Sequence, residues 1–164
     1  MAPPADRAVN PPTTHVSDLG DPPQVAGLSL AGSAPYVISA EENRALCEST
    51  GVAPATDGSA HPIYFYIATQ VGMGMTVAGL CAACEFNVED GPMMASSKVT
   101  FQRPLRTGQP YRVTGRIISL VRKPSRKLGV MDMLEYLLEL SLPDDGTRVL
   151  STTNVWVLPR RKLP

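Results

Sequence analysis

Residues 72–86 read GMGMTVAGLCAACEF and carry no charge before Glu85. A helix that is apolar on every side must be buried on every side, and small residues such as Ala78 and Gly79 let other backbone come close to it. We therefore expect a buried helix over residues 74–86, with the rest of the chain folded around it.

Four long runs that favour β-strands follow this stretch. In the last run Val155 and Val157 alternate with Trp156 and Leu158, which is the period of two expected of a strand. Turn-forming residues separate the runs, so we expect an antiparallel meander. The runs cover residues 98–102, 111–121, 130–142 and 148–158.

The run over residues 130–142 fits two structures. Leu134 and Leu138 are spaced for one face of a helix, but they also alternate with Glu135 and Glu139. The residues that follow, 143–146, read PDDG and are typical of a hairpin turn. We interpret the run as a strand, with a helix as the alternative.

Two short helices are expected before residue 72. Ser39 and Glu42 have the spacing of a capping box, so a helix should begin there, and Gly51 supplies its left-handed end. Pro62 suits the first turn of a second helical stretch over residues 63–70.

The N-terminal part of the chain differs in composition from the rest. The first 35 residues hold seven of the sixteen prolines and no aromatic residue. Such a segment buries too little to offset its ordering entropy, so we expect residues 1–34 to be a flexible or surface-draped arm. A partner-binding arm in polyproline conformation is the alternative. Residues 35–164 are then one domain.

Length, charge and cysteine content narrow the class of protein. The chain has 164 residues, the size of one domain, and its 15 Lys+Arg balance 15 Asp+Glu, which disfavours a dedicated nucleic-acid binder. No apolar run reaches membrane-spanning length, and the N-terminus lacks the pattern of a secretory signal. Three cysteines are too few for a disulfide framework. We expect a soluble, cytoplasmic protein.

The order of these elements resembles the hot-dog fold of MaoC-like hydratases and their thioesterase relatives, over roughly residues 36–160. The resemblance rests on four motifs together: HPIY at 61–64, GMGMT at 72–76, FQRPLRTG at 101–108 and VWVLPR at 155–160. It implies an α+β fold in which a curled antiparallel sheet surrounds a central buried helix. It also implies an activity on acyl thioesters and a homodimer.

The hydratase motif is altered in this chain. The family carries D-x-N-P-(Leu, Ile or Val)-H, and its Asp and His handle the proton and the water. Aligned by its Pro and Ile, the motif falls on residues 59–64, SAHPIY. Ser59 stands at the Asp position, Tyr64 at the His position, and His61 at the Asn position.

His61 is the candidate general base. Histidine titrates near neutrality without special tuning, and the chain's other histidine, His15, lies in the proline-rich arm. A loop histidine held by a backbone carbonyl is the alternative. The candidate catalytic residues are His61, Tyr64 and Thr76. The candidate substrate-binding residues are Ser59, Tyr66, Thr69, Gln70, Gly72, Met73, Gly74, Met75, Arg122, Lys123 and Arg126.

The glycines at 72 and 74 suggest a carbonyl-binding element. If a helix begins there, its free N–H groups carry partial positive charge and would polarise a thioester carbonyl. Tight packing of a glycine-rich helix against the sheet would require the same glycines. Thr76 is equally explained as a helix cap.

Residues 122–127, RKPSRK, place four cations at an expected hairpin tip. They are candidates for binding the phosphates of coenzyme A, a phosphopantetheine arm or an acidic carrier protein. The alternative is a solvated turn. Cys81 and Cys84 form a C-x-x-C, but with no second pair and no nearby histidine we expect neither a metal nor any other cofactor.

The resemblance, together with these residues, implies an enzyme that acts on acyl thioesters of coenzyme A or of an acyl carrier protein. One base without an Asp–His pair suits thioester hydrolysis, or addition of an amine such as glycine to an α,β-unsaturated thioester. The chain resembles polyketide-pathway thioesterase homologues that carry out this Michael addition. The alternatives are a MaoC-like hydratase or dehydratase, and a non-catalytic acyl-binding subunit. We expect no nucleic acid or membrane partner.

Overall fold

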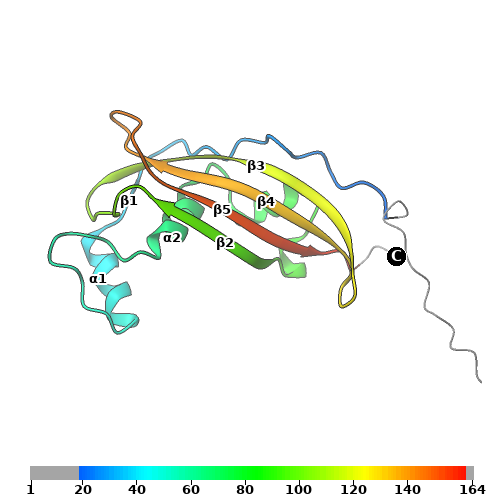
Figure 1. The fold of residues 1–164 in the computed structure, drawn as a ribbon, viewed down its shortest axis with the longest axis horizontal. Coiled ribbons are helices and arrows are strands. Elements are labelled where there is room, and N and C mark those ends of the chain that lie inside the picture. The colour runs from blue at the N-terminus through cyan, green and yellow to red at the C-terminus, as the bar shows by residue number, and fades with distance from the viewer. Residues whose placement is uncertain (1–18, 162–164) are drawn as a thin grey trace, which may run out of the picture.

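A five-stranded antiparallel sheet forms the body of the molecule (Figure 1). The structure is a computed structural model and describes residues 19–161. The strand order is β1-β3-β4-β5-β2, so β4 and β5 lie inside the sheet and β2 is an edge. The strands are β1 (Tyr36–Val37), β2 (Met93–Phe101), β3 (Pro110–Ser125), β4 (Gly129–Ser141) and β5 (Arg148–Pro159).

The four expected strand runs are confirmed, including the ambiguous one. Residues 130–142 lie almost wholly in β4, where every second side chain is buried, so the helical alternative is wrong. In the register of the sheet, Tyr136 lies between Ile117 of β3 and Asn154 of β5. The alternation places Leu134, Tyr136 and Leu138 on the inner face.

α2 packs against the curled sheet, whereas α1 lies beyond one end of it (Figure 1). The expected capping box is confirmed at the start of α1, where the Glu42 N–H donates to Ser39 Oγ at 3.0 Å. α2 packs against four of the five strands and buries Tyr64, Ala68 and Thr69. The helices are α1 (Ala40–Ser49), α2 (Tyr64–Gly72), α3 (Val77–Ala83) and the 3-10 helix η2 (Val88–Asp90).

The glycine-rich stretch differs from the expected continuous helix. α2 runs through to Gly72, the chain turns over the next four residues, and only then does the seven-residue α3 begin. One side of α3 is buried through Leu80 and Cys81, whereas Val77 on the other side is 37% exposed. Among the described residues, no single helix is long and apolar enough to span a membrane.

Residues 19–35, called here the N-terminal segment, run along the outer edge of β3 (Figure 1). The N–H groups of Gly27, Leu30 and Gly32 donate to carbonyls of β3 at 2.9, 2.9 and 3.0 Å. Leu30 is fully buried. Residues 1–18 of the expected arm lie outside the described residues.

Candidate functional site

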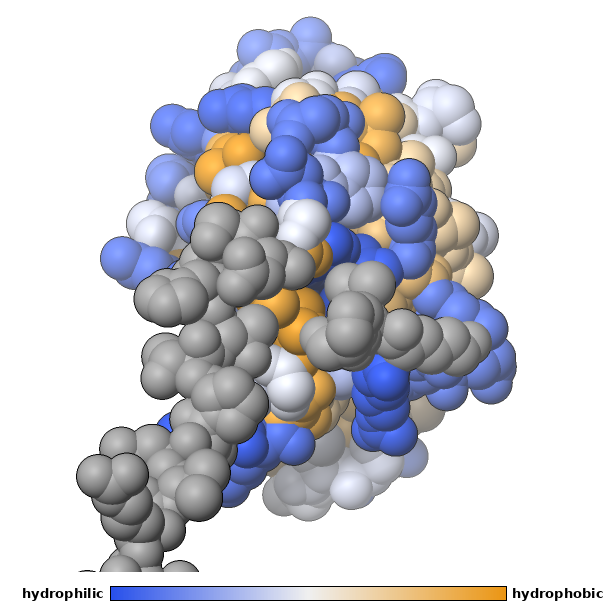
Figure 2. All heavy atoms as spheres, turned by 90° about the vertical axis from the view of Figure 1, so that its right-hand side faces the viewer, coloured by the Kyte–Doolittle hydropathy of each residue, from blue (hydrophilic) through white to orange (hydrophobic). Residues whose placement is uncertain are grey.

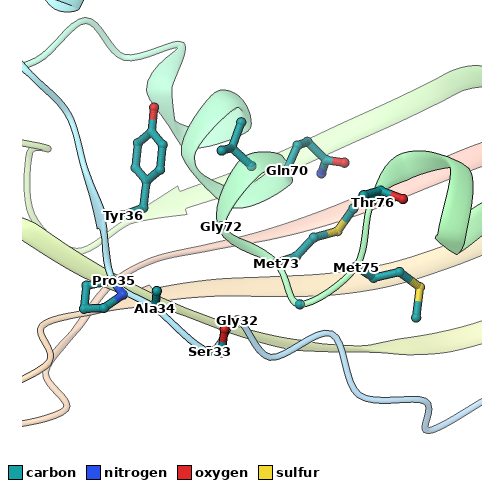
Figure 3. Close-up of a pocket in the computed structure, with 12 residues that line it drawn as sticks. Gly32, Ser33, Ala34, Pro35, Tyr36, Gln70, Gly72, Met73, Met75 and Thr76 are labelled. Atoms are coloured by element: carbon teal, nitrogen blue, oxygen red, sulfur yellow. The ribbon is translucent and has the colours of Figure 1, made fainter.

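A pocket of about 570 Å³ lies between the N-terminal segment and the turn that joins α2 to α3 (Figure 3). It brings together five of the expected substrate-binding residues, Gln70 and 72–75, and the expected catalytic residue Thr76, all close together along the chain. Residues 32–36, which the sequence had not indicated, form the opposite wall. The lining residues are Gly32, Ser33, Ala34, Pro35, Tyr36, Gln70, Val71, Gly72, Met73, Gly74, Met75 and Thr76.

At the glycines of this pocket, the backbone of the N-terminal segment crosses the backbone of the turn between α2 and α3 in close contact. A Cβ on Gly32 would lie 1.9 Å from the Gly72 carbonyl oxygen, and one on Gly74 would lie 2.1 Å from the Ala31 carbonyl oxygen. The Gly74 N–H donates to the Leu30 carbonyl at 3.4 Å. These glycines therefore allow the N-terminal segment to dock against the turn.

The expected carbonyl-polarising helix start is therefore not at Gly72 and Gly74. Gly72 is the last residue of α2 and Gly74 lies two residues beyond it, so both are at a helix C-terminus, where free carbonyl groups carry partial negative charge. The Gly74 N–H already has an acceptor in the N-terminal segment. The helix start lies later, at Thr76, whose hydroxyl oxygen accepts from the Gly79 N–H at 3.0 Å and thus acts as a cap.

Gln70 supplies a polar side chain at the inner wall of the pocket. Its Oε1 accepts a hydrogen bond from the hydroxyl of Tyr136 at 3.3 Å. Its Nε2 is buried and makes no hydrogen bond with any described residue. Burial raises the pKa of Tyr136, so its hydroxyl keeps its proton and bonds Oε1, which leaves Nε2 as a buried donor.

His61 lies in the loop before α2 and does not line this pocket. Its backbone N–H donates to Asn43 Oδ1 at 2.7 Å, and its Nδ1 accepts from the Ile63 N–H at 3.2 Å. Nδ1 is therefore an acceptor in the neutral ring, which puts the ring proton on Nε2. Base chemistry at Nε2 would require the other tautomer.

Four further expected site residues lie outside the pocket. Tyr64 is only 3% exposed, and burial raises its pKa. The Thr69 hydroxyl donates back to the Phe65 carbonyl of its own helix at 2.7 Å. Ser59 donates from its hydroxyl to an Asp57 carboxylate oxygen at 3.0 Å. Tyr66 is partly buried, and this burial raises its pKa.

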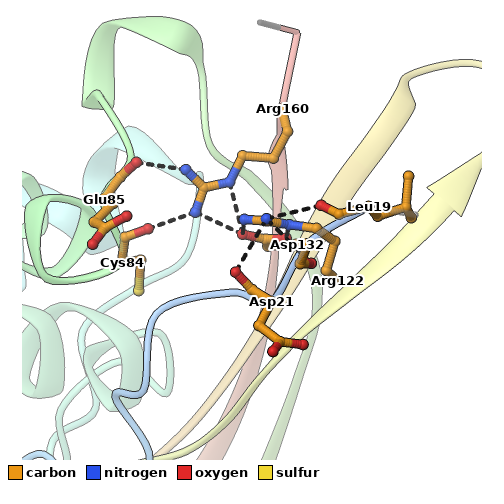
Figure 4. Close-up of polar contacts among 8 residues, drawn as sticks. Leu19, Asp21, Cys84, Glu85, Arg122, Asp132 and Arg160 are labelled. Atoms are coloured by element: carbon orange, nitrogen blue, oxygen red, sulfur yellow. Dashed lines mark hydrogen bonds and ion pairs between the residues drawn. The ribbon is translucent and has the colours of Figure 1, made fainter. Parts of the chain in front are cut away.

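The cationic run divides into two kinds of residue. Arg122 is not a free surface cation: its Nε donates to the fully buried Asp132 at 2.8 Å, and its Nη1 reaches the Leu19, Gly20 and Asp21 carbonyls of the N-terminal segment at 3.3–3.5 Å (Figure 4). Hydrogen bonding to Asp132 raises the pKa of Arg122. Arg122 is thus a structural residue.

Lys123 and Arg126 are exposed, one near the end of β3 and one in the hairpin between β3 and β4. Hydrophilic side chains cover much of the surface at this end of the molecule (Figure 2). These two side chains are free to meet an anionic ligand, but they do not line the pocket beside Gln70.

The second partner of Asp132 is Arg160, just after β5. Its Nε donates to Asp132 Oδ2 at 2.7 Å, and its other nitrogens donate to the carbonyls of Cys84 and Glu85 at the end of α3 (Figure 4). This cluster was not predicted from the sequence, although Asp132 lies within the expected strand run over residues 130–142 and alternates with Leu134 and Tyr136 onto the inner face. Only the strand register brings it opposite Arg122.

The two cysteines of the C-x-x-C are fully buried. Desolvation raises the pKa of the Cys84 thiol to about 11. Within residues 19–161, no three His, Cys, Asp or Glu side chains are grouped so that they could hold a metal ion.

No protein-family model matches the chain, and no curated protein matches it by sequence. Solved structures do match it in shape. The ChsH1–ChsH2 complex from Mycobacterium tuberculosis gives a TM-score of 0.54 at 14% identity, over 87% of this chain and 88% of that chain. A thioesterase from Thermus thermophilus, complexed with coenzyme A and Zn, gives 0.52 at 13% identity, over 79% and 80%. HtdX from Mycobacterium tuberculosis gives 0.62 at 15% identity, over 80% and 51%.

The chain has the hot-dog fold. The expected fold class is therefore confirmed: a curled antiparallel sheet with a helix, α2, packed against it. At these identities the likeness concerns the fold. In this hot-dog domain the pocket by Gln70 is built from sequence elements that are close to one another along the chain, plus the N-terminal segment.

Proposed function

We propose that this hot-dog protein is an enzyme that acts on acyl thioesters of coenzyme A or of an acyl carrier protein. The observation that carries the proposal is the pocket of about 570 Å³ with the Gln70 amide at its inner wall. That volume suits a small-molecule ligand. Among solved structures of the same fold, one is a thioesterase with coenzyme A bound.

Gln70 is the proposed carbonyl-binding residue. Its Nε2 is a buried donor with no partner among the described residues, and Tyr136 holds the amide in place through Oε1. A donor fixed before the reaction stabilises the charge that develops on a thioester oxygen without reorganising. Gln70 takes over the role that the sequence had suggested for the glycine N–H groups.

Hydrolysis, with water as the nucleophile, is the proposed reaction, and addition of an amine such as glycine to an enoyl thioester is its extension. His61 is the proposed base, as the one imidazole among residues 19–161; because it does not line the pocket, this role requires that the loop before α2 reach a thioester bound there. It acts through Nε2 after exchange of the ring proton to Nδ1, which gives up the bond from Ile63. This exchange costs about the free energy of one hydrogen bond.

A homodimer formed through β2 is part of the proposal. The other edge of the sheet is covered, because the N-terminal segment and β1 pair with β3. β2 pairs with β5 on one side, and among the described residues nothing pairs with its other side. Met93, Met94 and Phe101 on this strand are 41–46% exposed. An open edge of nine residues is suited to pairing with a second copy.

A non-catalytic acyl-binding subunit is the second candidate function. At the two positions where MaoC-like hydratases carry their acid and base, this chain has Ser59, which donates to Asp57, and Tyr64, which is 3% exposed. Neither offers a base to a ligand. One structure of similar fold is the complex of two different chains, ChsH1 and ChsH2. The replacement of the motif's Asp and His by Ser59 and Tyr64 also disfavours a MaoC-like hydratase or dehydratase.

Turnover by the purified protein decides between the two functions. Saturated and α,β-unsaturated thioesters of coenzyme A and of a carrier protein are incubated with the protein, with and without glycine, and the products are identified by mass spectrometry. Free acid or a glycine adduct supports the enzyme, and His61→Ala should then lower kcat by about 10² to 10⁴. Binding without turnover supports the subunit. Neither binding nor turnover would refute both.

A further inference from the structure

A row of polar side chains crosses the inner face of the sheet beneath α2. Thr152 and Asn154 of β5 are fully buried, and Trp156 of the same strand is 5% exposed. Asn154 lies between Tyr136 of β4 and Ser97 of β2 in the register of the sheet. The period of two along β5 therefore directs these side chains toward the helices and away from solvent.

Two of these side chains hold N–H donors that have no partner among residues 19–161. Asn154 Oδ1 accepts from the Ser97 hydroxyl at 2.7 Å, but Asn154 Nδ2 makes no hydrogen bond with a described residue. Trp156 Nε1 makes none with these residues either, while its ring packs edge-on against Tyr136 with centroids 5.7 Å apart. Among the described residues, the third buried side-chain N or O atom without a partner is Gln70 Nε2, beside the same Tyr136.

Three unpartnered donors around one tyrosine are unusual in a folded interior. Each buried polar group without a partner carries a free-energy penalty, and native proteins hold few of them. All three are donors, so an acceptor is what the cluster lacks. The proposed thioester carbonyl occupies only the donor of Gln70, which leaves Asn154 and Trp156 unused.

The missing acceptor is an uncharged oxygen. The only charged side chain on the inner faces of β4 and β5 is Asp132, which already binds Arg122 and Arg160. A carboxylate or phosphate beside Asn154 would have no cation to pair with, and burying it would be costly. A ketone or hydroxyl oxygen satisfies an amide and an indole donor without such a charge.

We propose that Asn154 and Trp156 form a subsite for a carbonyl or hydroxyl oxygen on the acyl chain, so that the substrate class is an oxygenated acyl thioester. The inference rests on the proposed function, because it takes the thioester to lie at Gln70. Met73 belongs to the pocket wall, is 5% exposed, and extends its side chain toward the Gln70 amide (Figure 3). A methionine is unbranched and has three rotatable bonds, so it moves aside as a chain enters.

Binding of stable amide analogues tests the subsite without any turnover. The probes are octanoyl-pantetheine amide and its 3-oxo, 5-oxo and 7-oxo forms, titrated into the full chain by calorimetry. At least one oxo probe should bind about tenfold more tightly than the octanoyl probe, since a site with buried donors discriminates against a chain that lacks the acceptor. Equal binding of all four probes overturns the subsite and leaves the proposed function standing. No binding of any probe overturns both.

Variants assign the preference to the two donors. Asn154→Leu and Trp156→Phe should each abolish the oxo preference and leave the affinity for octanoyl amide unchanged. Thr152→Val, which changes the same face without removing an unpartnered donor, should keep the preference. Asn154→Leu removes a donor that lacks a partner but also the acceptor of the Ser97 hydroxyl, which still has Thr152 Oγ1 at 3.4 Å, so the melting temperature should change little. If both donor variants unfold, or if the preference survives in both, the donors serve the fold or a trapped water only, and the inference is wrong.

Discussion

Arg160 donates from Nε to Oδ2 of Asp132 at 2.7 Å, although Asp132 has no exposed surface. Arg122 binds the other carboxylate oxygen at 2.8 Å. Through these two arginines, one buried carboxylate on β4 is connected to the carbonyls of the N-terminal segment and to those at the end of α3. One wall of the pocket belongs to the N-terminal segment, and the other wall directly precedes α3. The two arginines therefore anchor both stretches of chain that form the pocket.

Removing the carboxylate should therefore destabilise the whole domain. Asp132→Asn leaves two arginines that are largely buried without a counter-charge, and we expect a loss of about 3 to 5 kcal/mol in the free energy of unfolding. Urea titration measures it. The matched control is Glu139→Gln, which breaks the exposed pair with Arg148 and should cost less than about 1 kcal/mol. Equal losses for the two variants would contradict a structural role for the cluster.

A methyl group on Gly74 should displace the N-terminal segment. The new Cβ would lie 2.1 Å from the Ala31 carbonyl oxygen, which is backbone and cannot rotate away. We expect Gly74→Ala to cost about 1 to 3 kcal/mol, seen as a lower melting temperature. In the control Gly79→Ala, the Cβ meets the flexible Met75 side chain at 3.0 Å inside α3, so stability should be unchanged or about 1 kcal/mol higher.

Stability should fall at alkaline pH because of the buried thiols. Burial raises the pKa of Cys84 from 9.0 to about 11, so above pH 9 the unfolded chain releases a proton that the folded chain retains. The unfolded state is thereby favoured, and the free energy of unfolding drops by about 1.4 kcal/mol per pH unit between pH 9 and 11 for this group. Denaturant titrations at pH 8, 9 and 10 measure the slope. In Cys84→Ala, the free energy of unfolding should fall less steeply with pH. Identical slopes for the two proteins would mean that the Cys84 thiol is in contact with water.

The strands and α1 could be predicted from the sequence because their determinants are local. The alternation in residues 148–158 and the Ser39–Glu42 capping box act through neighbours a few residues apart. The turn at residues 73–76 could not be predicted in this way. Gly72 and Gly74 suit a helix start as well as a backbone crossing, and only the distant Ala31 and Gly32 decide between them.

The same difference between local and distant determinants explains which parts of the candidate site could be predicted. Gln70 and residues 72–76 were predicted because they lie close together in the sequence, whereas the opposite wall comes from a proline-rich stretch whose composition favours disorder. Arg122 was assigned to ligand binding because it stands among other cations. Its partner Asp132 faces it across the β3–β4 register, which depends on where the hairpin turns.

Neutralising the exposed cations should weaken substrate binding without harming the fold. Lys123→Ala with Arg126→Ala should raise KM for a coenzyme A or carrier-protein thioester and leave kcat nearly unchanged, because uniform binding is lost. Salt should have the same effect, since exposed charges are screened over about 8 to 10 Å at physiological ionic strength. Arg122→Ala is the contrast and should lower the melting temperature. A KM insensitive to both salt and mutation would make this hairpin a solvated turn.

The last prediction concerns the pair formed by Tyr136 and Gln70. Gln70→Leu removes the proposed carbonyl donor and should lower kcat/KM by about 10² to 10³, as loss of an oxyanion donor does. Tyr136→Phe keeps the glutamine but frees its Oε1, so the amide can turn and present an acceptor to the substrate. We expect a smaller loss, about tenfold.

The double variant separates positioning from direct binding. If Tyr136 acts only through Gln70, Tyr136→Phe added to Gln70→Leu should lower kcat/KM no further, because the orientation of an absent amide no longer matters. Additive losses would mean that Tyr136 contacts the substrate itself or supports the fold independently. Melting temperatures of all three variants are measured on the same preparations, so that a loss of folded protein is not mistaken for a loss of rate. Full activity of a folded Gln70→Leu protein would remove Gln70 from the mechanism and, with it, the role proposed here for the pocket.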